Sequence, residues 1–155
     1  MPARTRTTST NTILSDAERA FLDDHRVARL ATADDTGAPH AIPIVYALVD
    51  GRIYFVIDEK PKRTRTRLKR LQNIRQNPKV AMLIDDYDDD WSRLAYLLVQ
   101  GHAEVVTDRD EYTHTLAVLR GRYPQYQHMP LAFDTHPMVR ITPERQHLWH
   151  SGAAK

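Results

Sequence analysis

Two apolar segments joined by Asp50-Gly51 constrain the fold of this chain more than any other part of its sequence. Residues 39–49 and 52–58 are predicted strands, and the Asp-Gly between them is typical of a two-residue hairpin turn. Apolar residues occupy both alternating faces of the first strand: Ile42, Ile44, Tyr46 and Leu48 on one, Val45, Ala47 and Val49 on the other. Such a strand must be covered on both faces, by a helix, a closed barrel or another subunit.

Two helix starts can be recognised from capping patterns. Ser15 and Glu18 form a capping box, in which each side chain accepts a hydrogen bond from the other residue's backbone N–H. Asp108 is a suitable N-cap for a later helix, and Glu111 completes a second capping box. The predicted helices cover 16–25, a basic segment that ends at 77, and 108–120.

The remaining apolar segments predict a mainly β protein of the α+β class. Predicted strands cover 27–33, 39–49, 52–58, 80–84, two segments of 91–106 broken near Gln100-Gly101, 138–142 and 146–151. About six antiparallel strands with tight turns and a crossing helix favour a small barrel decorated by helices. With 155 residues, the chain has room for one domain with one core. We expect residues 1–12 to be a disordered lead and 13–155 to form that domain.

Composition excludes several kinds of chemistry. The chain has no cysteine, which rules out disulfides, thiolate metal sites and cysteine nucleophiles, so any redox chemistry must come from a bound cofactor. No apolar run is long enough to span a membrane and no hydrophobic signal core is present, so a cytoplasmic location is expected. No metal site is expected either: the aspartates of 85–90 lack the pattern of a calcium loop, and the histidines lack ligand spacing.

A dense basic stretch follows the hairpin. Between Lys60 and Lys79 there are nine lysine and arginine side chains and no carboxylate, although the net charge of the whole chain is only +2. The helix within it places Leu68, Leu71 and Ile74 on one apolar stripe and ends at Asn77-Pro78. So much charge of one sign favours an anionic ligand. A nucleic-acid surface or a plain solvated helix are the less favoured alternatives.

The order of these segments resembles the split-barrel flavin and deazaflavin family that includes pyridoxamine phosphate oxidase. The resemblance rests on the hairpin and on four short segments: Lys60 to Thr64, Leu68 to Ile74, Asn77 to Val80 and Asp88 to Arg93. It is strongest for the branch that uses the deazaflavin coenzyme F420, because a tryptophan and an arginine follow an acidic loop. It covers residues 14–106 well and the rest poorly.

The resemblance implies a six-stranded antiparallel split β-barrel of the FMN-binding type, a homodimer with a cofactor between its subunits. Backbone groups of four residues would line the cofactor ring: Pro43, Ile44, Val45 and Tyr46. Seven residues would contact its polar chain and phosphate: Asp58, Lys60, Lys62, Arg63, Thr64, Lys69 and Arg70. Trp91 and Arg93 would close the site, either from the same subunit or from the other one.

Coenzyme F420 is the expected cofactor and FMN the alternative. F420 carries a phosphodiester and a glutamate tail, and cations spread over a loop and a helix suit such an extended anion better than one compact phosphate. The implied reaction is hydride transfer to or from a small organic substrate, which needs alignment more than an acid–base pair. Tyr46, Tyr96 and His102 are candidate proton donors, with none preferred.

Some parts of the pattern leave other functions open. The segment between the third strand and the helix is longer than in pyridoxamine phosphate oxidase, so either Lys62-Arg63 or Lys69-Arg70 could hold a phosphate. The substrate arginine and histidine of that enzyme have no equivalent here, which disfavours vitamin B6 oxidation. A non-catalytic cofactor or tetrapyrrole carrier is the alternative outside enzymes. Tyr112, Tyr123 and Tyr126 are predicted to be packing or interface groups.

Overall fold

The computed structural model describes residues 13–59 and 69–152, so the predicted lead at 1–12 and much of the basic loop lie outside the described residues. The helices are α1 (Asp16–Asp24), α2 (Lys69–Gln76) and α3 (Arg109–Arg122), with the 3-10 helices η2 (Trp91–Arg93) and η3 (Pro124–His128). The strands are β1 (Val27–Ala33), β2 (Pro39–Val45), β3 (Ala47–Val49), β4 (Arg52–Val56), β5 (Lys79–Asp86), β6 (Ala95–Val105) and β7 (Met138–His150).

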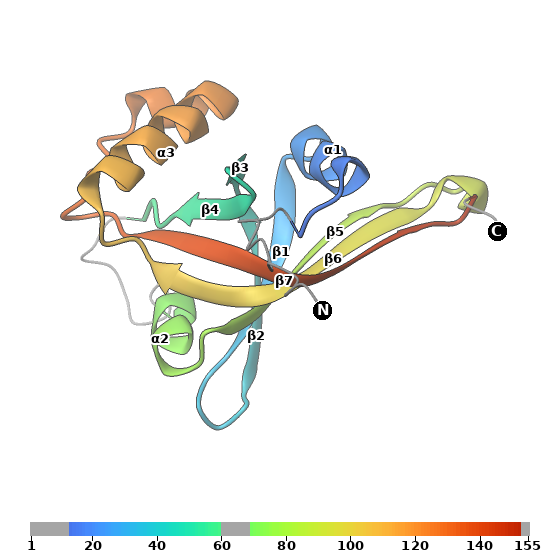
Figure 1. Cartoon of the computed structure of the whole chain (residues 1–155), viewed down its shortest axis with the longest axis horizontal. Helices are drawn as coiled ribbons and strands as arrows, with labels where there is room; N and C mark the ends of the chain where they lie inside the picture. Colours follow the sequence, from blue (N-terminus) through green and yellow to red (C-terminus); the bar gives the residue numbers. More distant parts are fainter. Residues whose placement is uncertain (1–12, 60–68, 153–155) are drawn as a thin grey trace, which may run out of the picture.

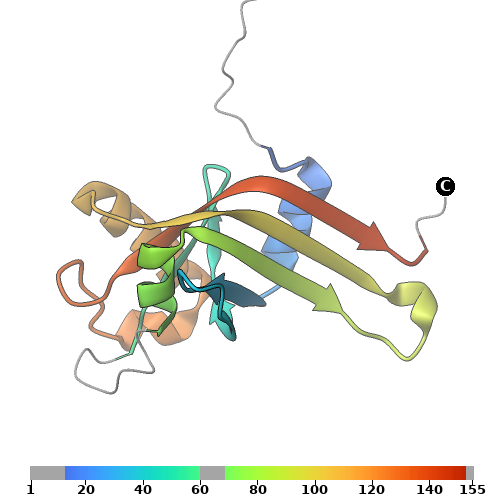
Figure 2. The same ribbon diagram turned by 90° about the horizontal axis from the view of Figure 1, so that it is seen from below.

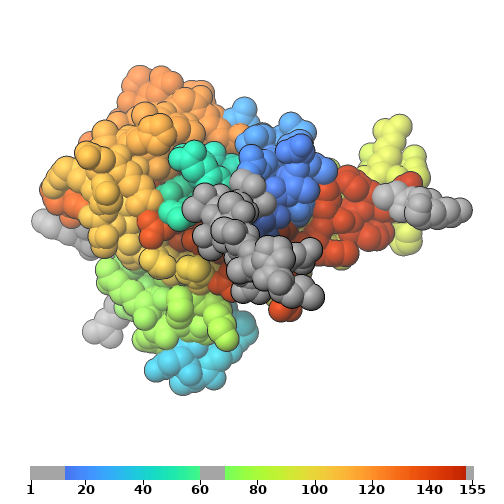
Figure 3. Space-filling view, viewed as in Figure 1, coloured from blue at the N-terminus to red at the C-terminus, as the bar shows by residue number. Residues whose placement is uncertain are grey.

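All seven strands belong to one antiparallel sheet in the order β2-β1-β5-β6-β7-β4-β3. The sheet curves into the antiparallel split barrel that the sequence predicts, with α3 and η3 over one end, α2 at another and α1 beside β1 (Figures 1 and 2). Seven strands replace the expected six because the predicted strand 39–49 is divided at Tyr46. The far ends of β5, β6 and β7 project from this body as an arm (Figure 3).

The hairpin between β3 and β4 is confirmed. Val49 pairs with Arg52 across the turn, and Asp50 and Gly51 have φ angles of 51° and 77°. Positive φ at both central residues is the geometry of a type I′ turn, whose twist matches that of the strands.

The long strands β6 and β7 correct two predictions. Residues 95–105 and 138–150 each form one strand where the sequence suggested two, because a shift of register at Gln100/Gly101 lets pairing continue through the irregularity. Residues 91–93, predicted as strand, form η2. Glycine is needed at position 101, since a Cβ there would overlap the carbonyl oxygen of Thr142 and lie 3.2 Å from Cα of Pro143.

Two clusters of buried side chains replace the single core expected. The larger cluster fills the barrel and contains Leu30, Ile44, Ile53, Phe55, Met82, Leu97 and Ile141. The smaller one lies between α3, η3 and the outer face of β3 and β4, and contains Ala47, Tyr54, Val56, Leu116, Leu119, Tyr123 and Tyr126. The alternating faces of 39–49 divide between the two clusters, so both faces are covered as predicted, by the barrel and by a helix.

The helix starts follow their caps, with one difference. Ser15 and Glu18 form the complete capping box of α1. Asp108 caps α3 by accepting hydrogen bonds from the backbone N–H of Asp110 and Glu111. The Glu111 carboxylate does not complete a second box, because it turns toward the sheet and accepts hydrogen bonds from Tyr54 and Arg140.

This Glu111 contact makes stability depend on pH. The Tyr54 hydroxyl lies 2.7 Å from one oxygen of the carboxylate, and Nη1 of Arg140 lies 2.7 and 2.8 Å from the two oxygens. Burial alone would raise the pKa of Glu111, but the hydrogen bonds from Arg140 and Tyr54 outweigh it and lower the pKa. The ionised form therefore stabilises the fold above the unfolded pKa, near 4.3, and this contribution is lost as pH falls through the lower folded value.

We expect Glu111→Gln to lower the free energy of unfolding at pH 7 by about 1.5–3 kcal/mol, the range for hydrogen bonds to a charged group. Urea denaturation at pH 7 and pH 3 measures this, and the gap from the parent protein should narrow at pH 3. Asp134→Asn is the control, since that carboxylate forms only an exposed contact with Arg109, 3.4 Å away, among the described residues. A gap of equal size at both pH values would contradict the expectation.

Helix α2 packs its apolar side inward as predicted and ends before Asn77-Pro78. Leu71 and Ile74 are buried, whereas Leu68 lies outside the described residues. The buried Asn73 side chain donates a hydrogen bond to the Thr32 hydroxyl at 3.0 Å, which ties α2 to β1. Within 13–59 and 69–152, no helix has the length and apolar character needed to cross a membrane.

Candidate functional site

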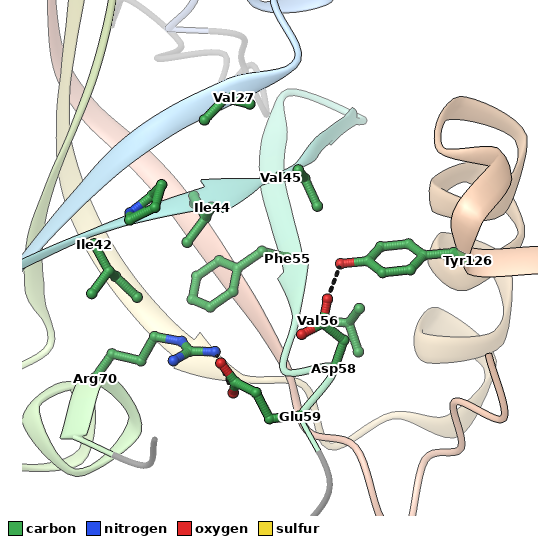
Figure 4. A pocket seen from close by; sticks show the side chains of 11 residues that line it. Val27, Ile42, Ile44, Val45, Phe55, Val56, Asp58, Glu59, Arg70 and Tyr126 are labelled. Carbon is green, nitrogen blue, oxygen red and sulfur yellow. Dashed lines mark hydrogen bonds and ion pairs between the residues drawn. The ribbon is translucent and has the colours of Figure 1, made fainter. Parts of the chain in front are cut away.

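A cavity of about 450 Å³ lies where the barrel is split, between the edge strand β2 and the end of β4 (Figure 4). The residues that line it come from β1, β2, β4 and the residues after it, α2 and η3: Val27, Ile42, Pro43, Ile44, Val45, Phe55, Val56, Asp58, Glu59, Arg70 and Tyr126. We call it the edge cavity. Its walls are mainly apolar, with a few convergent polar groups, which is the usual composition of a small-molecule site.

The position of β2 at the end of the sheet leaves one side of its backbone without a strand partner in the part of the chain that the structure describes. Pro43 in the middle of β2 suits an edge strand, because proline has no N–H to donate to a neighbouring strand. Free N–H and C=O groups on such an edge can pair with another molecule. The edge cavity therefore offers backbone hydrogen bonds on one side and the Phe55 ring on another (Figure 4).

Two polar contacts occupy the other walls. Nη2 of the buried Arg70 lies 2.8 Å from a carboxylate oxygen of Glu59. The Tyr126 hydroxyl donates a hydrogen bond to Asp58 at 2.8 Å (Figure 4). Burial, together with this hydrogen bond and the negative charge of Asp58, raises the pKa of Tyr126, so its hydroxyl stays protonated at neutral pH.

A second cavity, of about 660 Å³, adjoins the edge cavity and shares Val45, Asp58 and Tyr126 with it. Its other lining residues come mainly from the end of α3 and from η3: Arg26, Gly121, Arg122, Tyr123, Pro124, Gln125 and Met129. We call it the η3 cavity. The two cavities are neighbours, and the hydrogen-bonded pair Asp58 and Tyr126 lines both of them.

The edge cavity brings together five of the residues predicted for the cofactor: Pro43, Ile44, Val45, Asp58 and Arg70. Two others lie elsewhere. Tyr46 is fully buried and is absent from the lining, because its hydroxyl donates toward the carbonyls of Leu22 and His25. Lys69 points to the β1–β2 turn, where its Nζ lies 3.7 Å from Asp34.

The other predicted contacts do not line the edge cavity. Four of them lie outside the described residues: Lys60, Lys62, Arg63 and Thr64. Trp91 and Arg93 lie at the tip of the arm, where Trp91 is 69% exposed and Arg93 lies 3.7 Å from Asp90. Neither lines the edge cavity or the η3 cavity.

The candidate proton donors also lie away from the cavities. Tyr96 stacks on Trp149, with ring centroids 5.5 Å apart. His102 lies between two carboxylates, 2.6 Å from Glu144 and 3.2 Å from Glu104. With Tyr46 buried as described, none of the three lines the edge cavity.

Sequence reasoning missed several lining residues, among them Phe55, Glu59, Arg26 and Arg122. Tyr126 was predicted to be a packing or interface group, and it is in fact both buried in the smaller cluster and hydrogen-bonded to a cavity carboxylate. Its segment, rich in tyrosine and proline, carries no motif that signals this contact. The only signal for Glu59 was its position directly after the third predicted strand.

Fold and cavity define an antiparallel split barrel with a ligand-sized site at its open edge. A family model described as pyridoxamine 5′-phosphate oxidase matches residues 14–150, so the chain belongs to the pyridoxamine 5′-phosphate oxidase family. Among curated protein sequences, none matches this chain significantly.

Solved structures with the same fold differ in what they bind. A conserved hypothetical protein from Mycobacterium tuberculosis is 26% identical, with a TM-score of 0.69 and coverage of 92% of this chain and 88% of its own. An FAD-binding protein from Mesorhizobium loti is 25% identical, with a TM-score of 0.63 and coverage of 86% and 92%. HutZ, the heme storage protein from Vibrio cholerae, is 15% identical, with a TM-score of 0.64 and coverage of 84% and 89%, and shares the fold alone.

Proposed function

We propose that this protein is an oxidoreductase that holds coenzyme F420 in the edge cavity and reduces a small organic substrate, with FMN as the alternative cofactor. The observation that carries the proposal is a ligand-sized cavity between a free strand edge and a buried arginine. The FAD-binding protein from Mesorhizobium loti, at 25% identity, supports a cofactor of the flavin type.

The residues of the cavity suit a planar heterocycle with an anionic chain. The free edge of β2 can exchange hydrogen bonds with ring N–H and C=O groups, while Ile44, Val45 and Phe55 offer apolar contact. Arg70, whose Nη2 lies 2.8 Å from Glu59, places an arginine charge in the wall of this cavity that can attract a phosphate or carboxylate. When bound, either cofactor would supply hydride chemistry, and the protein would align the reactants and exclude water.

The basic stretch favours F420 over FMN within this proposal. Arg70 lines the edge cavity, and the segment 60–68, with five lysine and arginine residues in its sequence, lies between Glu59 and α2 in the chain. Cations spread over many residues can neutralise a long anion, such as a phosphodiester followed by glutamates. A single phosphate, as in FMN, would need fewer of them.

A homodimer is part of the proposal, supported by a partly apolar outer face. Three apolar side chains are 38–40% exposed: Val27, Leu83 and Trp149. Their strands lie close together in the sheet, because β1 pairs with β5 and β6 lies between β5 and β7. Leu83 pairs with Leu98, which is half-buried. Arg29 and Asp85 lie on the same face and form an exposed ion pair at 4.0 Å, and a mixed face of exposed apolar and charged residues suits a protein interface. Because Val27 also lines the edge cavity, a second subunit on this face would help to enclose the cofactor.

Fluorescence titration of purified apo-protein with F420, and separately with FMN, tests the cofactor. We expect tight F420 binding that Arg70→Ala weakens about tenfold or more, the loss typical of a charge-assisted pair. Arg75→Ala is the matched control, since this arginine is exposed on the same helix and lines neither cavity. Lys62→Ala/Arg63→Ala tests the other predicted phosphate contact. Preference for FMN would move the protein to the flavin branch, and binding of neither would refute the proposal.

The dimer is tested by Leu83→Asp. A buried charge is costly, so we expect this variant to be monomeric by light scattering and to bind F420 more weakly. His114→Asp, on the exposed side of α3, should leave both mass and affinity unchanged. A parent protein that is monomeric at working concentration would contradict the expectation directly.

A further inference from the structure

The η3 cavity contains two arginines without a carboxylate partner. Arg26 and Arg122 line it, and neither lies within 4.0 Å of an acidic group of residues 13–59 and 69–152. The one carboxylate among the described lining residues, Asp58, already accepts the hydrogen bond from Tyr126. The η3 cavity therefore has uncompensated positive charge on one side.

Arg122 provides a fixed part of that charge. Its Nε donates to the Tyr46 carbonyl at 3.0 Å, its Nη1 to the Asp23 carbonyl at 3.0 Å and its Nη2 to the carbonyls of Leu22 and His25. Most of its N–H groups are thus used within the protein. Arg122 can attract an anion through its field but has little left to donate.

Arg26 has the free donors. Its Nη1 donates to the Arg122 carbonyl, and its guanidinium carbon lies 5.8 Å from the centre of the Tyr123 ring. Among the described residues, Nε and Nη2 have no acceptor. These two nitrogens form one edge of the guanidinium, the edge that can bind both oxygens of a carboxylate. Arg26 is exposed, and the contacts of Nη1 and the ring restrict its guanidinium without using that edge.

The other walls of the η3 cavity suit an apolar or aromatic body. Val45, Pro124 and Met129 offer apolar surface, and Tyr123 and Tyr126 offer rings. Val45, Asp58 and Tyr126 are shared with the edge cavity, so a ligand in the η3 cavity would lie beside whatever occupies the edge cavity.

We infer that the η3 cavity is the substrate site and that it binds planar organic carboxylates, with the carboxylate on Arg26 and the conjugated body toward Val45 and Tyr126. This inference rests on the proposed function in one respect, namely that a cofactor ring occupies the neighbouring edge cavity. Binding of a carboxylate to the apo-protein tests the site independently of that ring.

The first experiment uses fluorine NMR of 4-fluorobenzoate with the full-length apo-protein. The neutral, similarly shaped 4-fluorobenzamide is the matched ligand. We expect benzoate to bind at least about tenfold more tightly than benzamide, and Arg26→Gln to abolish that preference. Arg26→Lys keeps the charge but cannot donate two parallel hydrogen bonds, so its preference for benzoate should lie between those of the parent protein and Arg26→Gln. Arg109→Gln, an exposed arginine at the other end of α3, should bind like the parent protein.

Several outcomes would overturn the inference. They are equal binding of benzoate and benzamide, full benzoate affinity in a folded Arg26→Gln variant, and no benzoate binding at about 20 mM, well above the millimolar range of weak ligands. Thermal melting of each variant establishes that it is folded.

A second experiment separates this inference from the proposed function. Protein loaded with F420 or FMN is titrated with 4-fluorobenzoate while the ring absorbance is recorded, and a saturable shift is expected in the parent but not in Arg26→Gln. Cofactor binding without such a shift would overturn the inference and leave the proposed function intact. Arg26-dependent benzoate binding by a protein that binds neither cofactor would refute the proposed function and support the carboxylate site.

Discussion

Gly101→Ala is expected to prevent stable folding or to lower the free energy of unfolding by more than about 4 kcal/mol, beyond the usual range for a single substitution. The added methyl group would overlap the Thr142 carbonyl oxygen and lie 3.0 Å from its carbonyl carbon. Both atoms belong to the backbone of β7, so no side chain can rotate away. Relief would require β6 and β7 to separate at the register shift that keeps these two long strands paired.

Gly121→Ala provides the matched control for the same chemical change. Gly121 lies in α3, and a Cβ there would meet no atom within 4 Å. Alanine loses less backbone entropy than glycine in a helix, so this variant should be more stable by about 0.5–1 kcal/mol. If the expectation is correct, urea denaturation will show a lower free energy of unfolding for Gly101→Ala and a higher one for Gly121→Ala than for the parent protein. A Gly101→Ala protein as stable as the parent would show that the close approach of β7 is not required.

Arg122→Ala is expected to lower the free energy of unfolding by about 3 kcal/mol or more. The guanidinium joins three carbonyls at the end of α1 to the Tyr46 carbonyl between β2 and β3. Its loss would leave several of these acceptors without partners, at a cost of about 1–3 kcal/mol for each one that water cannot reach. It would also release α1 from the end of α3.

Arg109→Ala is the control for this variant, because its ion pair with Asp134 is exposed and should contribute less than about 1 kcal/mol. Arg122→Lys should recover only part of the loss, since a single ammonium group cannot reach all four carbonyls. Hydrogen exchange offers a second readout, with faster exchange expected in α1 of the Arg122→Ala protein. Equal unfolding free energies for the two alanine variants would contradict the assigned role.

Short-range signals in the sequence predicted the local structure well. The turn at Asp50-Gly51, the capping box of Ser15 and the N-cap at Asp108 are each determined by residues within a few positions. The break at Tyr46 could not be predicted in this way. Its backbone N–H donates to the Tyr123 hydroxyl at 3.1 Å, so a residue far along the chain divides one predicted strand into two.

In the candidate site, too, the residues within recognised motifs were predicted and those placed by tertiary packing were not. The residues of β2, with Asp58 and Arg70, were found through the resemblance, which covers the first two thirds of the chain, and they meet in the edge cavity. Tyr126 and the arginines of the η3 cavity lie outside any motif. Tyr126 and Arg122 are placed by the packing of α3 and η3 over β4, and Arg26 by its contact with the Arg122 carbonyl, which are properties of tertiary structure.

The sheet order also has a consequence for biosynthesis. The early hairpin β3–β4 gains its other neighbour only when β7 is made, since Ile53 pairs with Ile141. At a synthesis rate of about 5–20 residues per second, this edge of β4 stays without its β7 partner for several seconds. The barrel can therefore close only after β7 has been made, and until then the unpaired edge of β4 is open to pairing with other chains.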